Sequence, residues 1–407
     1  MSFHQIDGPG NLPLLEVCID FTNNPTNGSR VWTDVTTDIR QISYTRAGRS
    51  DALQQTATGS LSAVLDNTSG NYDPSNTTGA YYPGVKRMRC IRVRAQWGGV
   101  TYNRFQGYVT SWALSWPGPG SDSICTITGV DALKVLALFD LGGKHYSAQR
   151  TDQRVSAICT DAGLPYSVFT GAANVVDSGT IATGTFALSH LQQVEDTEDG
   201  RLFADAGGTI VFQNRGYRST YSTASSGTVG DHVAGGEIPY REASAVSDDA
   251  NIWNNILVTP SGGTAQTASD STSQSEHYTR TLSKSLLTSS GVDALATAQY
   301  LLEIYKEPSP KVPALQLIPS RSTAVWPTVL AATNGQRFTF FRRPSYGVLE
   351  LLGFVEQVSD SISPGDAWDV SLQLADIDSS GGGTFTSFWV LQDSTYSVLG
   401  TTTALGY

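Results

Sequence analysis

The 407 residues are too many for one ordinary hydrophobic core and predict roughly two to four domains. Charged residues make up only 15% of the chain, against about 25% in an average soluble domain; this is typical of a protein whose faces are covered by neighbours, although a secreted β-protein has the same composition. The formal net charge of −11 argues against a sequence-independent grip on nucleic-acid phosphates by the chain as a whole.

Residues 1–140 are predicted to form a β-domain. Residues 14–21 and 31–44 have the composition of strands, and residues 61–65 alternate apolar and polar side chains before a turn cluster at 66–74. A hairpin pattern then completes the domain.

That hairpin pattern, at residues 89–131, occurs again at residues 337–376. Each copy alternates apolar and polar residues, breaks at a Pro-Gly pair and resumes its alternation, which is typical of an antiparallel hairpin with one buried face. The spacing from glycine to aspartate differs by one residue, which the turn absorbs. The aligned positions are Gly107 with Gly353, Tyr108 with Phe354, Val109 with Val355, Pro119-Gly120 with Pro364-Gly365, and Asp131 with Asp376. We therefore expect two homologous β-domains.

Between the two copies, residues 141–240 predict a small α+β domain. Apolar residues recur at helical spacing in residues 154–162 and 186–199. A hairpin follows, with Gly207 and Gly208 at its turn.

Residues 241–377 are predicted to form the second β-domain, with an added helix. Residues 252–259 have a strand pattern, and the Ser, Thr and Gln stretch at 262–275 predicts a long exposed loop. Residues 291–305 predict the helix, because leucines and alanines share one side and prolines close its end. The second hairpin copy completes the domain.

The last 30 residues, 378–407, predict an arm behind a flexible glycine joint at 381–383. Aromatic and apolar residues at 385–391 would be costly to leave exposed, so the arm is expected to pack on this chain or on a neighbour. No run of about 18 apolar residues and no basic, apolar leader occurs in the sequence, so neither a membrane anchor nor a secretion signal is expected.

The sequence contains no catalytic motif, and no catalytic, cofactor-binding or metal-binding residues are predicted. His190 with the acidic residues 195–199 could form a metal site, but an acidic helix end is more often solvated surface. The cysteines stand singly in apolar patterns and are interpreted as small buried hydrophobes. The scattered histidines are His4, His145, His190, His232 and His277, and the cysteines are Cys18, Cys90, Cys125 and Cys159.

Three further groups of residues are candidates for a functional role. The oxygen-rich segment 66–74 resembles a calcium loop but lacks the spacing of an EF-hand, so a tight turn explains it better. Asp248-Asp249 are adjacent and so are poorly placed to act as a catalytic pair on a strand. Several aromatic residues could stack on sugars or bases, although core or interface packing is the more common role. They are Tyr81, Tyr82, Trp97, Trp112 and Trp116.

Several segments together resemble the minor tail proteins of long-tailed phages of actinobacteria and related hosts. The likeness covers about residues 14–377. The segments that carry it are W-T-D-V-T-T-D-I-R at 32–40, R-x-G-R-S-D at 46–51, G-x-L-x-x-x-L-D-N-x-x-G-x-Y-D-P at 59–74, F-Q-G-Y-V at 105–109, the helix and hairpin at 187–215, and the strand at 248–259.

The resemblance implies a tail-tip hub, similar to the hub of contractile baseplates and to the N-terminal part of tail-associated lysins. The expected fold is mainly β, with two tube-type β-barrel domains and a small α+β domain. Three chains would then offer six barrels below a sixfold tail tube and surround the DNA exit channel, without binding the DNA specifically. Expected partners are the distal tail protein and tail tube above, and other tip or fibre proteins and the tape measure protein. The expected place is the tail tip of a virion assembled in the host cytoplasm.

No peptidase or lysozyme domain is recognised after residue 377, so lytic activity is not expected. Three alternatives remain open. A hexameric distal tail protein normally carries one tube-type barrel, so the two hairpin copies argue against it. A carbohydrate-binding or wall-degrading protein would use the aromatic loops, and a secreted β-adhesin would pair its cysteines in disulfides.

Overall fold

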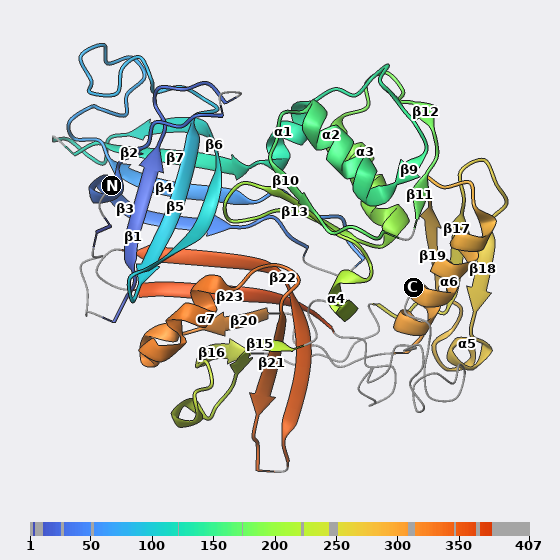
Figure 1. Ribbon diagram of the computed structural model, residues 1–407. Coiled ribbons are helices and arrows are strands. Elements are labelled where there is room, and N and C mark those ends of the chain that lie inside the picture. Colours follow the sequence, from blue (N-terminus) through green and yellow to red (C-terminus); the bar gives the residue numbers. More distant parts are fainter. Residues whose placement is uncertain are drawn as a thin grey trace.

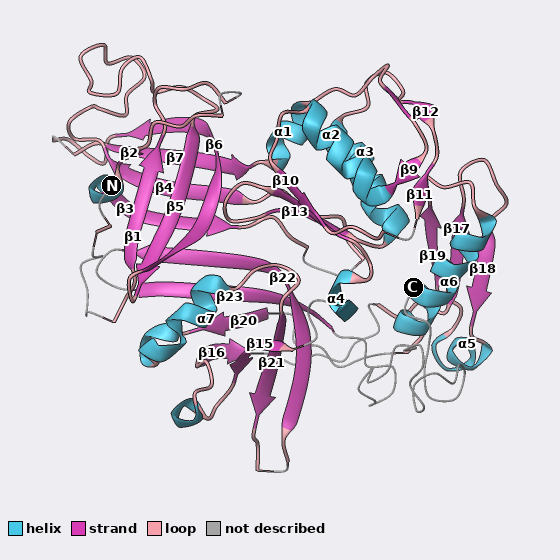
Figure 2. Ribbon diagram, viewed as in Figure 1, coloured by secondary structure: helices cyan, strands magenta, loops and turns pink. Residues whose placement is uncertain are grey.

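Most strands belong to one 13-stranded sheet that curls on itself, so the chain is mainly β as predicted (Figure 1, Figure 2). The computed structural model describes residues 3–4, 11–25, 28–49, 53–120, 122–172, 174–220, 224–243, 251–307, 314–345, 347–363 and 367–376. The predicted arm at 378–407 and the Asp248-Asp249 pair lie outside these ranges. No described helix is both long enough and apolar enough to cross a membrane.

The first half of the sheet follows the alternation of the sequence. In the strand at Ser60–Asp66, for example, Leu61, Ala63 and Leu65 are buried while Ser60 and Ser62 are exposed. Its strands are β1 (Leu14–Ile19), β2 (Thr33–Asp34), β3 (Ile39–Thr45), β4 (Ser60–Asp66), β5 (Cys90–Trp97), β6 (Val100–Ser115) and β7 (Ile124–Asp131), in the order β3-β4-β7-β6-β5-β1-β2.

The second half of the sheet is drawn in orange and yellow-green in the lower part of Figure 1. Its strands are β15 (Ser225–Val229), β16 (Tyr240–Ala243), β20 (Ala314–Leu317), β21 (Arg337–Arg342), β22 (Leu349–Ser363) and β23 (Ala367–Asp376), in the order β16-β20-β23-β22, with β21 between β22 and β15. The helix α7 (Trp326–Ala331) packs within this half, and its Trp326 lies between Trp97 and Trp368, with ring centroids 6.2 and 5.8 Å away. One continuous hydrophobic core spans both halves.

The two halves join where β22 pairs antiparallel with β3. Ser359 lies opposite Thr45, and Ile362 lies opposite Ile42. Both isoleucines are fully buried. This joint was not predicted from the sequence.

The predicted repeat is confirmed as one hairpin built twice. Gly107 of β6 lies opposite Asp131 of β7, and Gly353 of β22 lies opposite Asp376 of β23. Both long strands then carry a β-bulge three residues after the glycine, where Thr110 and Glu356 are left out of the pairing. A bulge at the same place in both copies shows that the likeness extends to backbone geometry.

The equivalence continues into the strand before each hairpin. Met88 and Gly335 both have positive φ, +62° and +83°, and both donate a backbone hydrogen bond to the valine that precedes the bulge, Val109 or Val355. This conformation is easy for glycine and costly for methionine. Strand β21 is therefore the counterpart of β5.

On the other side, β16 and β20 are the counterparts of β3 and β4. Ile39 pairs with Leu65 and Tyr240 with Leu317, and a register shift follows both pairs. The outermost strands differ, because β1 runs antiparallel to β5 whereas β15 runs parallel to β21.

The α+β part contains both predicted helices and the predicted hairpin. The hairpin turns at Gly208, whose φ is +82°, and the parallel strand β10 extends its sheet. The core includes Val155, Leu191 and Phe212. The elements are α1 (Leu133–Leu138), β8 (His145–Tyr146), β9 (Gln149–Arg150), α2 (Thr151–Asp161), β10 (Tyr166–Val168), β11 (Val175–Val176), β12 (Gly179–Thr180), α3 (Ala187–Glu198), β13 (Arg201–Ala204), β14 (Ile210–Gln213) and α4 (Tyr217–Thr220).

Residues 251–307 form a small three-stranded sheet of their own, covered by the predicted helix at 291–305. The exposed loop predicted at 262–275 is wrong, because the segment contains a paired edge strand and a short helix. Asp270 caps that helix by accepting hydrogen bonds from the backbone N–H groups of Thr272 and Ser273, each 3.0 Å long. The elements are β17 (Asn255–Thr259), β18 (Gln266–Ser269), α5 (Ser271–His277), β19 (Thr281–Ser285) and α6 (Gly291–Tyr305), with the strand order β18-β17-β19. The domain boundaries predicted at residues 140, 240 and 377 stay predictions.

Candidate functional site

The structure directs His190 and Glu195 of α3 to different partners, so the metal site considered for this helix is not assembled. The imidazole Nε2 of His190 lies 3.2 Å from Nη1 of Arg154, and burial together with the Arg154 charge lowers the pKa of His190 to about 4. Glu195 instead accepts from Arg49 at 2.6 Å. Neither side chain has a metal-like arrangement of neighbours.

One three-residue group among the described residues does bring ligand atoms together. Atoms of Glu276, His277 and Glu307 lie within 4.8 Å of one another, and both glutamates are exposed. Exposed acidic groups of this kind are common without an ion, so we assign no metal to them.

The segment 66–74 is a turn held by its own side chains. Asp66 accepts from the backbone N–H of Thr68 at 2.9 Å, and Asn67 accepts from that of Tyr72 at 2.9 Å. These side-chain oxygens are engaged in local turns, as the tight-turn interpretation expects.

All four cysteines are free and buried, which confirms their interpretation as small hydrophobes and contradicts the disulfides of a secreted adhesin. Burial raises the pKa of the Cys18 and Cys90 thiols to about 11.

Most of the aromatic residues considered for ligand stacking are used in packing. The Tyr81 ring stacks on Phe21 at 4.3 Å, and the Trp112 ring lies 6.4 Å from that of Tyr72. Trp97 packs against the buried Trp326. Tyr82 and Trp116 are the exposed members of the set, and Trp116 is 66% exposed.

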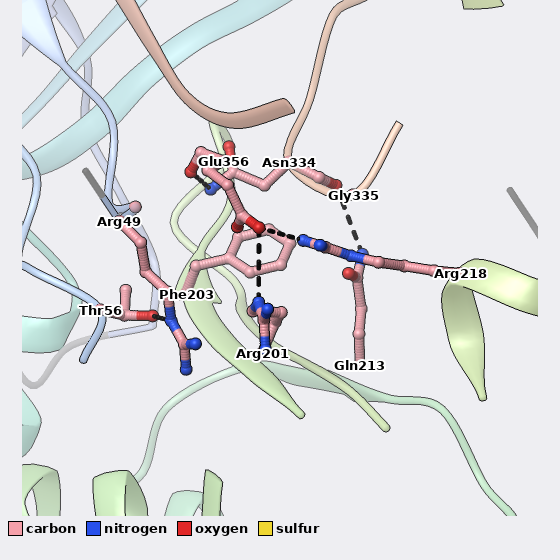
Figure 3. Close-up of a pocket in the computed structure, with 10 residues that line it drawn as sticks. Arg49, Thr56, Arg201, Phe203, Gln213, Arg218, Asn334, Gly335 and Glu356 are labelled. Carbon is pink, nitrogen blue, oxygen red and sulfur yellow. Dashed lines mark hydrogen bonds and ion pairs between the residues drawn. The ribbon is translucent and has the colours of Figure 1, made fainter. Parts of the chain in front are cut away.

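A group of buried and half-buried charges lies where the α+β part meets the second half of the sheet (Figure 3). Glu356, the bulge residue of β22, accepts from Arg218 at 2.5 Å and lies 3.5 Å from Arg201. Burial alone would raise the pKa of Glu356, but the neighbouring guanidinium groups of Arg218, Arg201 and Arg49 lower it below its usual value. Asn334 clamps the bulge by donating to the backbone oxygens of Glu356 and Ala47, at 2.7 and 2.8 Å.

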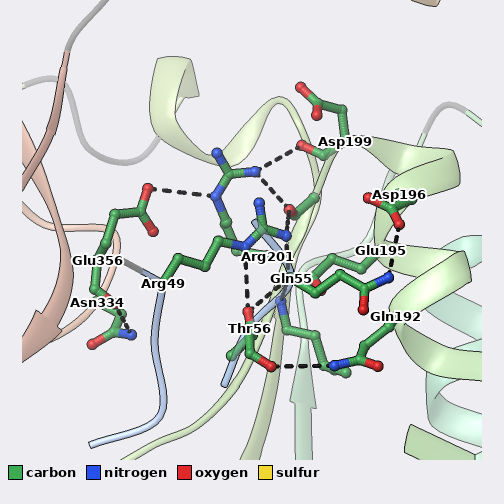
Figure 4. A network of polar contacts seen from close by, with 12 residues as sticks. Arg49, Gln55, Thr56, Gln192, Glu195, Asp196, Asp199, Arg201, Asn334 and Glu356 are labelled. Carbon is green, nitrogen blue, oxygen red and sulfur yellow. Dashed lines mark hydrogen bonds and ion pairs between the residues drawn. The ribbon is translucent and has the colours of Figure 1, made fainter. Parts of the chain in front are cut away.

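A second carboxylate continues this network toward α3 (Figure 4). Glu195 accepts from Arg49, from the Thr56 hydroxyl at 3.0 Å and from the backbone N–H of Leu202 at 2.6 Å. Asp199, at the end of α3, is half-buried, and although desolvation opposes its charged form, Lys284, Arg201 and Arg49 lower its pKa to about 2. We call these residues the ionic joint: Arg49, Glu195, Asp199, Arg201, Arg218, Lys284 and Glu356.

The recess between these side chains has no room for a ligand. Both glutamates are paired with arginines, Glu356 with Arg218 and Glu195 with Arg49. The arrangement therefore joins five separate segments of the chain, at Arg49, residues 195–201, Arg218, Lys284 and Glu356. Sequence reasoning missed it, and the only available signal was the charge of Glu356 inside the apolar run L-L-G-F-V-E-Q-V.

No protein-family model and no curated protein matches the sequence. Solved structures do match over nearly the whole chain. The 43 kDa tail protein of prophage MuSo2 from Shewanella oneidensis is 13% identical and has a TM-score of 0.57, with 89% of this chain and 96% of that chain covered. The tail protein from Neisseria meningitidis MC58 is 11% identical, with a TM-score of 0.59 and coverages of 88% and 96%. The prophage tail protein gp18 from Listeria monocytogenes EGD-e is 10% identical, with a TM-score of 0.50 and coverages of 88% and 94%. At these identities the likeness shows a shared fold.

Proposed function

We propose that the protein is a structural component of a phage tail tip, a hub in which three chains adapt a sixfold tail tube to a threefold tip. The observation that carries this proposal is the internal duplication, matched in strand register and in the position of the bulge. The fold supports it, because the similar solved structures are tail proteins of nearly the same extent.

The contact between the two halves of the sheet is of the type from which rings of repeated units are built. It places one edge of the second half, on β22, against a different edge of the first half, on β3. A contact between two different edges of equivalent units is heterologous, and such contacts repeat into a ring when the rotation closes. Two units in each chain therefore allow three chains to present six similar units to a hexameric neighbour.

The chain's acidic balance suits a channel through which DNA passes without binding, because negative side chains repel phosphates. Under this proposal the protein is not an enzyme. Its partners are the distal tail protein and tail tube on one side, and the tape measure protein and other tip or fibre proteins on the other. The protein is located at the tail tip of the virion and is assembled in the host cytoplasm.

Light scattering of the purified protein tests the number of chains. The hub requires a particle of three times the chain mass of 43.4 kDa. A particle of six chains would favour the hexameric distal tail protein. Incubation with host cell wall in a zymogram tests the non-enzymatic role, and clearing of the wall would contradict it.

A further inference from the structure

Two arginines and one aspartate are buried together where β22 pairs with β3. Asp360 of β22 lies opposite Tyr44 of β3. Arg46 follows two residues after Tyr44, so both side chains project from the same buried face. Arg104 reaches this face from β6 and pairs with Asp360. We call these four residues the arginine cluster, and their exposed fractions are 2% for Tyr44 and Asp360, 4% for Arg46 and 0% for Arg104.

The one carboxylate of the cluster is fully engaged by other groups. Asp360 accepts from the Arg104 guanidinium at 2.7 and 2.6 Å, and from the Trp368 indole at 2.8 Å. Arg46 donates to the backbone oxygen of Ala332 at 2.7 Å. Throughout the described part of the chain, no carboxylate forms an ion pair with Arg46.

Arg46 nevertheless keeps its charge at neutral pH. Burial and the charge of Arg104 lower the pKa of Arg46 to about 9, against the opposing influence of Asp360 and Asp205. Asp205 is engaged in a turn of its own, where it accepts from the backbone N–H groups of Gly207 and Thr209 at 2.8 and 2.9 Å. The arginine cluster thus holds two positive charges against one negative charge, in a place from which water is largely excluded.

Three buried polar atoms of the cluster also have no hydrogen-bond partner. They are Nε of Arg46, Nε of Arg104 and the hydroxyl oxygen of Tyr44. Buried donors without a partner are uncommon and costly in native proteins. A guanidinium N–H can only donate and a hydroxyl can donate as well, so the missing group is an acceptor. A water molecule could accept these hydrogen bonds, but it would leave the second arginine without a counter-charge.

We propose that the arginine cluster binds a small monovalent anion such as chloride. The unpartnered donors of Tyr44, Arg46 and Arg104 hold the anion, and hydrogen bonds from charged groups are the stronger kind. Tyr44 and Arg46 belong to the first half of the sheet, and Asp360 belongs to the second half. The anion therefore stabilises the contact between the two halves within one chain, whatever the number of chains in the particle.

Urea unfolding at constant ionic strength tests for the site. Sodium chloride replaces sodium gluconate, whose anion is too bulky for a site whose side chains are at most 4% exposed. When an anion binds only the native state, the equilibrium constant of unfolding falls in proportion to one plus the ratio of anion concentration to dissociation constant. We expect this constant to be about elevenfold lower at a chloride concentration of ten times the dissociation constant.

Tyr44→Phe distinguishes the anion from packing. In gluconate the Tyr44 hydroxyl has no partner, so its removal should not destabilise the protein. In chloride the same variant loses a donor to the anion, and the chloride dissociation constant should rise at least about tenfold. Stability of this variant that is lowered equally in both salts would overturn the proposal.

Arg46→Met removes the unpaired charge and should abolish the response to chloride. The matched control is Arg241→Met, because Arg241 is exposed and pairs with Asp369 at the surface, and it should keep the full response. Equal responses of the two variants would overturn the proposal. If Arg46→Met does not fold, Tyr44→Phe and the crystal experiment still decide.

A crystal structure in sodium bromide locates the ion directly, because bromide scatters anomalously. We expect an anomalous peak within hydrogen-bonding distance of Arg46 and Tyr44. A water molecule at this place, or no density at all, overturns the proposal. A bromide peak without any effect of chloride on unfolding marks binding at crystal concentration only and also overturns it. None of these results depends on the number of chains, so the proposed function is tested separately.

Discussion

Removing the carboxylate of Asp360 should strongly destabilise the large sheet. Arg104, on β6, is fully buried, and its guanidinium donates to both oxygens of Asp360 and, at 2.7 Å, to the backbone oxygen of Leu330. Burial lowers the pKa of Arg104, but the neighbouring Asp360 and Tyr44 raise it above its ordinary value, so this residue stays charged at any accessible pH.

The size of this loss in stability follows from the buried charge of Arg104, which the substitution leaves without its carboxylate partner. Breaking a buried ion pair by removing one partner costs about 3–5 kcal/mol, whereas replacing both partners with apolar residues is often neutral. Asp360→Leu should therefore lower the free energy of unfolding by about 3–5 kcal/mol, although the first half of the sheet carries Leu114 at the equivalent position. Arg104→Met combined with Asp360→Leu should recover most of this loss.

Urea unfolding followed by tryptophan fluorescence measures the effect, because Trp368 donates directly to Asp360 and Trp326 packs on Trp368. The two single variants and the double variant form a double-mutant cycle. A cost below about 1 kcal/mol for Asp360→Leu, or a double variant no more stable than that single variant, would refute the reasoning.

Three further predictions concern the ionic joint, a buried histidine and the repeated glycine. Glu356→Gln should lower the free energy of unfolding by about 3 kcal/mol, because Arg218 and Arg201 lose their carboxylate partner. As a control, Glu350→Gln changes an exposed residue and should alter the free energy of unfolding by less than about 0.5 kcal/mol. Equal effects of the two substitutions in urea unfolding would argue against a structural role for the ionic joint. Because burial and Arg154 lower the pKa of His190 to about 4, below the ordinary 6.5, its contribution to stability is present above pH 6.5 and is lost as the pH falls toward 4. The loss should reach up to about 3 kcal/mol and be absent in His190→Gln, so parallel pH profiles of the two proteins would contradict it. Gly107→Ala should destabilise the protein more than Gly353→Ala, because an added Cβ would lie 2.1 Å from the Val130 backbone oxygen in the first case and 3.0 Å from the Leu374 Cβ in the second; thermal unfolding of both variants checks the order, and the reverse order would contradict it.

The repeat could be predicted from sequence because both hairpins keep the same marks: a glycine at the start of the pairing, a turn, and an aspartate at its end. A Cβ at Gly107 would lie 2.1 Å from the Val130 backbone oxygen, and a Cβ at Gly353 would lie 3.0 Å from the Leu374 Cβ, so the first position requires glycine and the second favours it. These requirements are local along the chain, and they survive when most of the other side chains change.

The joints could not be predicted in this way. The pairing of β22 with β3 brings together residues more than 300 positions apart, and the alternation of each strand is satisfied whichever edge meets it. The ionic joint likewise depends on arginines and glutamates from four separate segments, each of which resembles a solvated surface charge in the sequence. The small sheet at 251–307 was partly missed because residues 262–275 are polar. The strand within that segment, β18, is an edge strand with little apolar alternation.

A cryo-EM reconstruction of the assembled protein tests the central claim most directly, because it shows rotational symmetry and the number of sheet units around the axis together. The account predicts a threefold particle in which six similar β-units, two from each chain, surround one channel. A sixfold particle of six chains, or a threefold particle in which only one unit of each chain faces the channel, would contradict it.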